Sequence, residues 1–144
     1  MMSPLQRAER VGALMYADDA TSQSLGLELL GIGPGTASMR LHVKPTMTNG
    51  LGICHGGFIF LLADTTFAYA CNSQNLRSVA ASAQIDFLGP AQRGEVLTAI
   101  GVEQHRASRS GVYDIRVTNQ ADALIALFRG KSAVIKGHVF EEIE

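Results

Sequence analysis

The segment from Gly56 to Asn72 constrains the fold more than any other part of the chain. Its apolar residues follow one another without alternation, and the segment is too long for a typical strand. A helix that is hydrophobic nearly all round has to be buried on every side. We therefore expect one long helix at the centre of the molecule, with the rest of the chain wrapped around it.

Two short runs before this helix and four longer runs after it have the pattern of strands. Residues 37–43 alternate strictly between apolar and polar, as in a half-buried strand. Turn signals such as Gly89-Pro90 separate the later runs, which favours an antiparallel meander. A weak helical stripe over about residues 5–24, ending near Gly26, precedes them. The expected strands cover residues 27–32, 37–43, 78–88, 95–104, 112–118 and 124–135.

This order of elements predicts an α+β fold in which an antiparallel sheet of about six strands wraps around the long helix. The chain has 144 residues, of which 47% are hydrophobic, and this suits one domain over residues 1–144 with its own core. Two cysteines are too few for a disulfide framework.

The charge balance excludes several classes of partner. The formal net charge is −1, from 12 basic and 13 acidic residues, so no broad basic surface is available for nucleic acid or an anionic membrane. The longest apolar stretch, residues 58–71, is shorter than the ~20 residues of a membrane span. Residues 1–16 lack the apolar core of a signal peptide. We expect a cytoplasmic protein.

Asp64 is the one charged residue between Gly56 and Asn72. An isolated carboxylate in hydrocarbon costs several kcal/mol, so a buried one is normally hydrogen-bonded or used chemically. Asp64 either lies at an exposed edge of the helix or caps another group, or it is a reactive carboxylate in a dry cleft. We favour the reactive carboxylate.

The sequence His55-Gly56-Gly57 stands at the start of the expected helix. The first N–H groups of a helix have no internal acceptor and lie at the positive end of its dipole. Glycine removes the side chain that would keep a substrate oxygen away. The Gly56 amide therefore suits a carbonyl oxygen that becomes negative during acyl transfer, although the two glycines also suit a plain tight turn.

Gly56 and Asp64 are too far apart to act on one carbonyl from the same helix. At 1.5 Å per residue, they are separated by about 12 Å along the helix axis. If they cooperate, they come from antiparallel helices of two subunits. The spacing therefore predicts a homodimer with shared active sites.

Six short motifs lie between residues 55 and 132. They are HGG at 55–57, LADT at 62–65, FAYACNS at 67–73, IDFL at 85–88, GVYDI at 111–115 and ALFRGKS at 126–132. Over about residues 16–135 the sequence resembles the hotdog-fold acyl-CoA thioesterases, and within them the phenylacetic-acid-degradation (PaaI) family. A related group of hotdog thioesterases has Glu at the catalytic position, so Asp64 favours the PaaI-like group.

The resemblance implies a hotdog dimer with two shared active sites, commonly paired into a homotetramer. It matches Asp64 to the catalytic carboxylate and Gly56 to the oxyanion amide. His55 and Asn49 match residues that border the thioester. The substrates that it implies are phenylacetyl-CoA and its ring-hydroxylated relatives.

Other candidate chemistries have less support. The four histidines lack metal-ligand spacing, no serine or cysteine stands in a nucleophile elbow, and no glycine-rich stretch matches a nucleotide fingerprint. We therefore expect no metal and no cofactor apart from the coenzyme A of the substrate. The turn over residues 105–111 carries Arg106 and Arg109. It is either a solvated hairpin or a contact for the coenzyme A phosphates, which guanidinium groups suit.

These observations favour an acyl-CoA thioesterase that releases a free acid and CoA. Asp64 either activates a water as general base or attacks the carbonyl to form a mixed anhydride. Asn49 or His55 would orient the acyl group or the water. Two alternatives stay open: a hotdog acyl-CoA hydratase or dehydratase that uses His55 and Asp64 as an acid–base pair, and an acyl-CoA-binding protein without activity.

Overall fold

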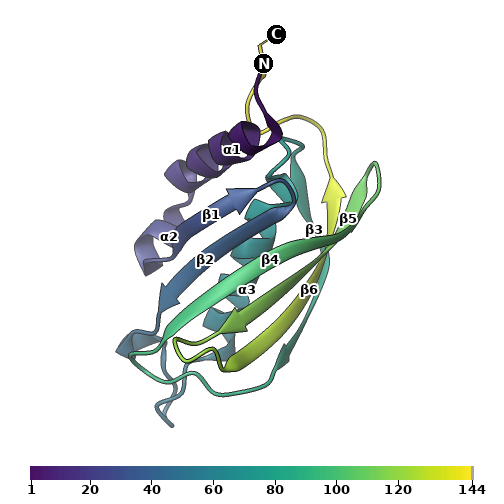
Figure 1. The fold of residues 1–144 in the computed structure, drawn as a ribbon. Helices are drawn as coiled ribbons and strands as arrows, with labels where there is room; N and C mark the ends of the chain where they lie inside the picture. Colours follow the sequence, from purple (N-terminus) through teal and green to yellow (C-terminus); the bar gives the residue numbers. More distant parts are fainter. Residues whose placement is uncertain (144) are drawn as a thin grey trace.

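A computed structural model describes residues 1–143 (Figure 1). The helices are α1 (Pro4–Asp18), α2 (Ala20–Leu25) and α3 (Gly56–Asn72), with a 3-10 helix over Pro45–Met47. The strands are β1 (Glu28–Gly33), β2 (Thr36–His42), β3 (Ser78–Phe87), β4 (Val96–Arg106), β5 (Ser110–Thr118) and β6 (Leu124–Val134). The long helix has the predicted bounds, and each strand lies within a few residues of its predicted position. No helix among these residues combines the length and the hydropathy needed to cross a membrane.

The N-terminal segment forms two helices, so the prediction of a single helix over about residues 5–24 is wrong. Asp19 causes the break, because its side chain accepts a hydrogen bond from the Ser22 N–H at 3.0 Å and caps α2. Gly26 ends α2 in the left-handed conformation, with φ of 78°. The predicted end of the helical region near Gly26 is therefore confirmed.

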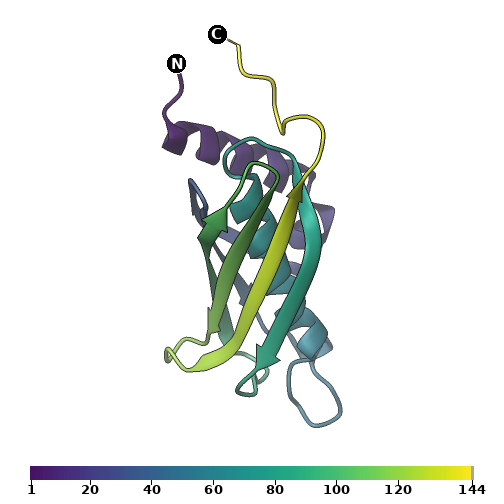
Figure 2. The same ribbon diagram turned by 90° about the vertical axis from the view of Figure 1, so that its right-hand side faces the viewer.

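The six strands form one antiparallel sheet in the order β1-β2-β4-β5-β6-β3. β4, β5 and β6 form the expected meander, but β3 pairs with β6 and not with β4. The meander prediction is therefore wrong for β3. The reason is that α3 crosses one face of the sheet, so that β3, which follows it, lies at the edge opposite β1 (Figures 1 and 2). The next strand, β4, then pairs with β2.

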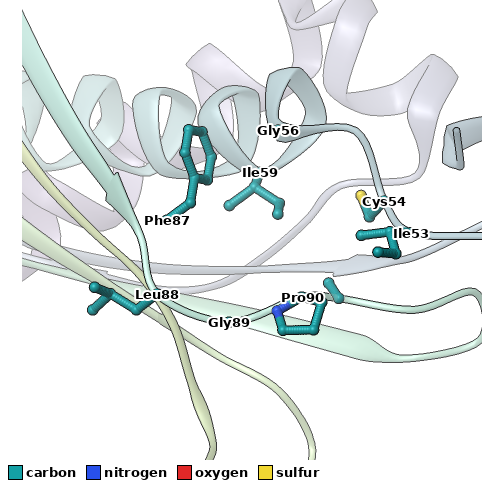
Figure 3. Close-up of a pocket in the computed structure, with 9 residues that line it drawn as sticks. Ile53, Cys54, Gly56, Ile59, Phe87, Leu88, Gly89 and Pro90 are labelled. Atoms are coloured by element: carbon teal, nitrogen blue, oxygen red, sulfur yellow. The ribbon is translucent and has the colours of Figure 1, made fainter. Parts of the chain in front are cut away.

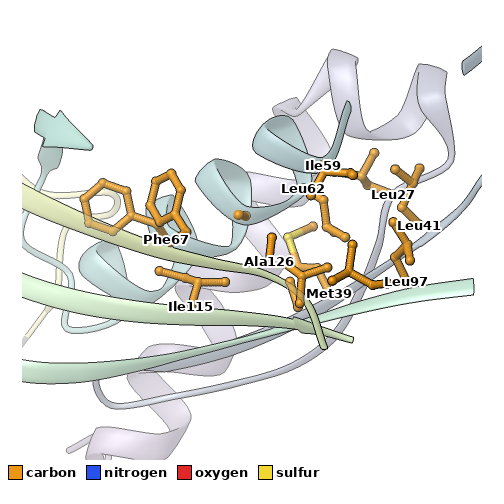
Figure 4. Close-up of a cluster of buried hydrophobic side chains, with 14 of the residues drawn as sticks. Leu27, Met39, Leu41, Ile59, Leu62, Phe67, Leu97, Ile115 and Ala126 are labelled. Carbon is orange, nitrogen blue, oxygen red and sulfur yellow. The ribbon is translucent and has the colours of Figure 1, made fainter. Parts of the chain in front are cut away.

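The sheet curves around α3, which contacts every strand. Leu62 and Phe67 of α3 pack against Met39 and Ile115 of the strands in one buried core (Figure 4). Gly130 of β6 allows this close approach, because a Cβ there would lie 2.8 Å from the Phe67 ring. The predicted arrangement, an antiparallel sheet wrapped around a central helix, is confirmed.

One stripe of α3 is not covered by the sheet. Its residues follow the i, i+4, i+7, i+8 and i+11 spacing of one helix face. Gly57 is exposed and the other four residues are half-buried. The stripe consists of Gly57, Leu61, Asp64, Thr65 and Ala68. The prediction that the helix is buried on every face is therefore wrong for the single chain, because the sheet encloses only part of the helix. The edge strand β3 is also mostly exposed.

Candidate active site

The N-terminal end of α3 carries two free amide N–H groups. The His55 N–H donates to the Met47 carbonyl at 2.9 Å, and the Phe58 N–H donates to the His55 carbonyl at 3.0 Å. The N–H groups of Gly56 and Gly57 have no such acceptor among residues 1–143. They lie at the positive end of the helix dipole, where a developing oxyanion is stabilised best.

A cavity of about 460 Å³ opens beside Gly56 (Figure 3). Ile53 and Cys54 of the preceding loop and Ile59 of α3 form one side, and residues 87–91, from the end of β3 and the turn after it, form the other. The Phe87 ring lies against Gly56, since a Cβ on Gly56 would be 3.0 Å from the ring. The free amide therefore sits at the edge of an open cavity.

Asn49 organises the loop that leads into α3. Its Oδ1 accepts hydrogen bonds from the Leu51 and Ile53 N–H groups at 2.9 and 3.2 Å, and its own N–H donates to the Ile53 carbonyl at 2.8 Å. The Nδ2 group has no acceptor in the described part of the chain and is available as a donor. Asn49 thus positions residue 53, which forms part of the cavity wall.

Asp64 lies on the uncovered stripe of α3, about 12 Å along the helix from Gly56. Its carboxylate is half-buried and has no hydrogen-bond or ion-pair partner among residues 1–143, so it caps no other group there. Burial raises the pKa of Asp64 above the ordinary carboxyl value. A partly desolvated carboxylate without a partner is typical of functional sites.

His55 lies next to Gly56 as the N-cap residue of α3. Its side chain is exposed and makes no capping hydrogen bond. The ring therefore does not fix the turn by a hydrogen bond. Within one chain, the structure brings His55 and Asn49 to the same end of α3 as Gly56 and leaves Asp64 two helical turns away.

Arg106 and Arg109 lie at the opposite end of α3. Arg106 lines a second cavity together with Gln74 and Asn75, which follow the helix, and its Nε is 3.8 Å from Glu103 Oε1. The 17-residue helix separates this turn from Gly56 by about 25 Å. The two arginines are therefore remote from the Gly56 amide of their own chain.

Cys54 and Cys71 are buried free thiols. Burial raises the pKa of the Cys54 thiol and raises that of Cys71 to about 12. A thiol with a raised pKa is a poor nucleophile near neutral pH. Among residues 1–143, no group of three or more His, Cys, Asp or Glu side chains is placed to hold a metal ion.

Comparison with known proteins identifies the class. The family model of the thioesterase superfamily matches residues 51–126, more than half of the chain. The chain belongs to the thioesterase superfamily and is a thioester hydrolase with the hotdog fold. The fold class expected from the motifs is therefore confirmed.

Individual relatives also confirm the resemblance to the PaaI group. The acyl-coenzyme A thioesterase PaaI of Escherichia coli is 46% identical over 128 residues, which cover 89% of this chain and 91% of the relative. The solved structure of the E. coli PaaI protein from the phenylacetic acid degradation operon matches with a TM-score of 0.93 and 44% identity over 94% of this chain and 99% of that one. A mutant of the phenylacetic acid degradation protein PaaI from Thermus thermophilus matches with a TM-score of 0.76 and 32% identity over 79% and 97%.

Two features of the site have no clear signal in the sequence. Phe87 stands in the IDFL motif, but its pattern marks it only as the end of a strand. Pro90 is marked only as part of a turn, although both residues line the cavity beside Gly56. Contacts between elements that are distant in the chain decide these roles, and local patterns do not record them.

We predict that Asp64→Asn stabilises the fold at neutral pH. Because the pKa of Asp64 is raised in the folded state, the folded chain holds this proton more tightly than the unfolded chain. Ionisation at Asp64 therefore lowers stability as the pH rises through the carboxyl range, and asparagine removes that loss. Thermal unfolding at pH 7 should show a Tm higher by about 2–4 °C.

The difference in Tm should shrink as the pH falls below the ordinary carboxyl range, where both states are protonated. Asp122→Asn, in an exposed turn, is the matched control and should leave the Tm nearly unchanged. A lower Tm for Asp64→Asn at pH 7 would show that the ionised carboxylate has a stabilising partner.

Proposed function

We propose that the protein hydrolyses acyl-CoA thioesters in active sites shared between two subunits. The observation that carries this proposal is a pair of unpartnered groups on α3, the free N–H of Gly56 and the half-buried carboxylate of Asp64. A carbonyl under attack needs both a donor for its oxygen and a base or nucleophile. The family membership and the E. coli relative, an acyl-coenzyme A thioesterase, support the same reaction.

Antiparallel packing of two α3 helices would bring these groups together. A twofold axis that passes near residue 60, midway between the two, places Gly56 of each chain level with Asp64 of the other. The uncovered stripe of α3 carries both Asp64 and Gly57, and glycine allows close approach of a second helix. The exposed edge strand β3 offers a further surface to the second subunit, because its outer N–H and C=O groups are unpaired.

We further propose that two such dimers form a homotetramer. The outer face of the sheet exposes three apolar side chains, Ile100, Val102 and Leu127, whose exposed fractions are 51%, 43% and 41%. Apolar residues grouped on a sheet face favour contact with another protein surface.

The proposed reaction begins with the thioester carbonyl oxygen accepting a hydrogen bond from the Gly56 N–H. Asp64 from the other subunit then acts in one of two ways. As a general base it takes a proton from a water molecule whose oxygen attacks the carbonyl carbon; as a nucleophile it attacks the carbon itself, and water later hydrolyses the mixed anhydride. In both routes the carbon–sulfur bond breaks and CoA leaves as the thiol after protonation. The Asn49 Nδ2 and His55 border the same end of α3 and are proposed to orient the acyl group or the water.

The coenzyme A phosphates are proposed to contact Arg106 and Arg109. In an antiparallel pair, the β4–β5 turn of one chain lies toward the end of α3 where the other chain has Gly56. The phosphates would then bind to the subunit that supplies Asp64. No metal or further cofactor is needed, because the amide and the carboxylate supply the two functions that hydrolysis requires.

We propose phenylacetyl-CoA, or a ring-hydroxylated phenylacetyl-CoA, as the substrate, and the cytoplasm as the site of action. The support is the similarity to PaaI proteins, one of which comes from a phenylacetic acid degradation operon. A panel of acyl-CoA thioesters, with thiol release measured for each, tests this choice directly.

We predict that Asp64→Asn lowers kcat by a factor of at least about 10² while the fold is retained. The wild-type kcat/KM should fall as the pH is lowered through a pKa above the ordinary carboxyl range, because only ionised Asp64 is active. Residual activity of the variant should lack this acidic limb. Thiol release from phenylacetyl-CoA between pH 4 and 9 measures both effects, and near wild-type turnover would remove Asp64 from the mechanism.

A second prediction distinguishes the contribution of the Gly56 N–H to catalysis from that of the small size of the residue. Gly56→Pro removes the N–H at the first helical position, which proline tolerates, and the extended His55 backbone suits a following proline. It should lower kcat by about 10²–10³.

Gly56→Ala is the matched control, since it adds a Cβ beside Phe87 but keeps the N–H. It should retain much more activity than Gly56→Pro. Equal losses in the two variants, with both folded, would mean that space beside Phe87 matters and the hydrogen-bond donor does not.

A further inference from the structure

The side chains that line the cavity beside Gly56 are apolar. The side chains that face it include Ile53, Ile59, Phe87 and Pro90 (Figure 3), and no charged side chain lines it among the described residues. Three of its backbone donors are already used: the Cys54 N–H donates to the Ala91 carbonyl at 2.7 Å, and the Leu88 and Gly89 N–H groups donate to the Ile125 carbonyl at 2.8 and 3.2 Å. The Gly56 amide, which has no acceptor among residues 1–143, is a free donor at this cavity.

A thioester carbonyl held at Gly56 has two substituents, and one of them has to enter the cavity. The sulfur side continues into pantetheine, whose two amides need hydrogen-bond partners that the side chains of these walls do not supply. The acyl side is apolar and loses no hydrogen bonds there. A volume of about 460 Å³ lies within the usual range for small-molecule sites and accommodates an aromatic or a medium-length acyl group.

Phe87 is a wall of this cavity that lies outside the buried core. It is the last residue of β3, 53% of its surface is exposed, and its ring lies against Gly56. Ile59, in contrast, is only 3% exposed and belongs to the core. In Figure 3 Ile59 projects from α3 and Phe87 projects from the end of β3 toward the same space.

We infer that this cavity receives the acyl group and that Phe87 sets its width, which makes Phe87 a specificity-determining residue. This inference rests on the proposed hydrolysis of acyl-CoA at Gly56. A smaller residue at position 87 widens the cavity beside the reacting carbonyl, and a larger one fills it. Contacts to the acyl group change the relative kcat/KM of different substrates, whereas contacts to the coenzyme A part change all substrates alike.

The test uses the full-length chain and three substrates, acetyl-CoA, phenylacetyl-CoA and decanoyl-CoA, with thiol release followed for each. Phe87→Trp should lower the kcat/KM ratio of phenylacetyl-CoA to acetyl-CoA by at least about tenfold. Phe87→Ala should raise the ratio of decanoyl-CoA to acetyl-CoA by at least about fivefold. Leu30→Ala, an exposed apolar residue of β1 at the opposite edge of the sheet and outside the cavity, is the control and should shift neither ratio.

Light scattering of each variant shows whether the assembly is retained. If the folded variants hydrolyse all three substrates with unchanged ratios, or if every substrate loses activity by the same factor, the cavity does not hold the acyl group and the inference is wrong. If the wild-type protein releases thiol from none of the three, the proposed function fails together with the inference. A lower phenylacetyl-CoA to acetyl-CoA ratio for Phe87→Trp, together with a higher decanoyl-CoA to acetyl-CoA ratio for Phe87→Ala, supports the inference.

Discussion

The lone carboxylate on the central helix is the constraint on which the rest of the structure depends. α3 is apolar enough to be a core helix, yet it carries Asp64 on the stripe that its own sheet leaves uncovered. Complete burial of that stripe within the chain would leave a charge in hydrocarbon without a partner, which is costly. The fold instead encloses α3 on its other sides and leaves Asp64 half-buried, with a raised pKa and no hydrogen-bond partner within residues 1–143.

The same helix supplies the second group. Because α3 begins at Gly56, its first amides point out of the helix without acceptors, and the Asn49 loop and the end of β3 form walls beside them. One element therefore carries a hydrogen-bond donor at its positive end and a carboxylate two turns later. The two groups are about 12 Å apart along one helix, so in the proposed reaction they act together only when two chains assemble. In that proposal, the stability of the single chain and the activity of the dimer make opposite demands on Asp64.

Much of this architecture could be predicted from local patterns. The all-round hydrophobicity of residues 56–72 defined α3 to the residue, and Gly26 marked the end of the N-terminal helical region. The position of β3 could not be predicted, because strand order depends on where α3 returns the chain and not on the sequence of β3. The break at Asp19 depends on a capping hydrogen bond that competes with a continuous helix.

The candidate site could be proposed from the sequence in part. A charge inside an apolar helix and glycines at its start are visible in any sequence, so Asp64 and Gly56 are candidates from the residues alone. The contact of Phe87 with Gly56 joins positions 31 residues apart, and the Asn49 side chain accepts hydrogen bonds from two N–H groups of its own loop, those of Leu51 and Ile53. Neither kind of contact leaves a periodic pattern in the sequence.

The central claim is that each active site takes Gly56 from one chain and Asp64 from another. It is tested most directly by mixing two inactive proteins, one with Asp64→Asn and one with Gly56→Pro, under conditions in which differently tagged chains exchange subunits. In a mixed dimer one site carries both substitutions and the other carries neither, so the account predicts that thiol release from acyl-CoA returns, up to about one quarter of the wild-type level for random pairing of equal amounts. Exchange that is demonstrated by co-purification of the two tags, without any return of activity, would contradict a shared site.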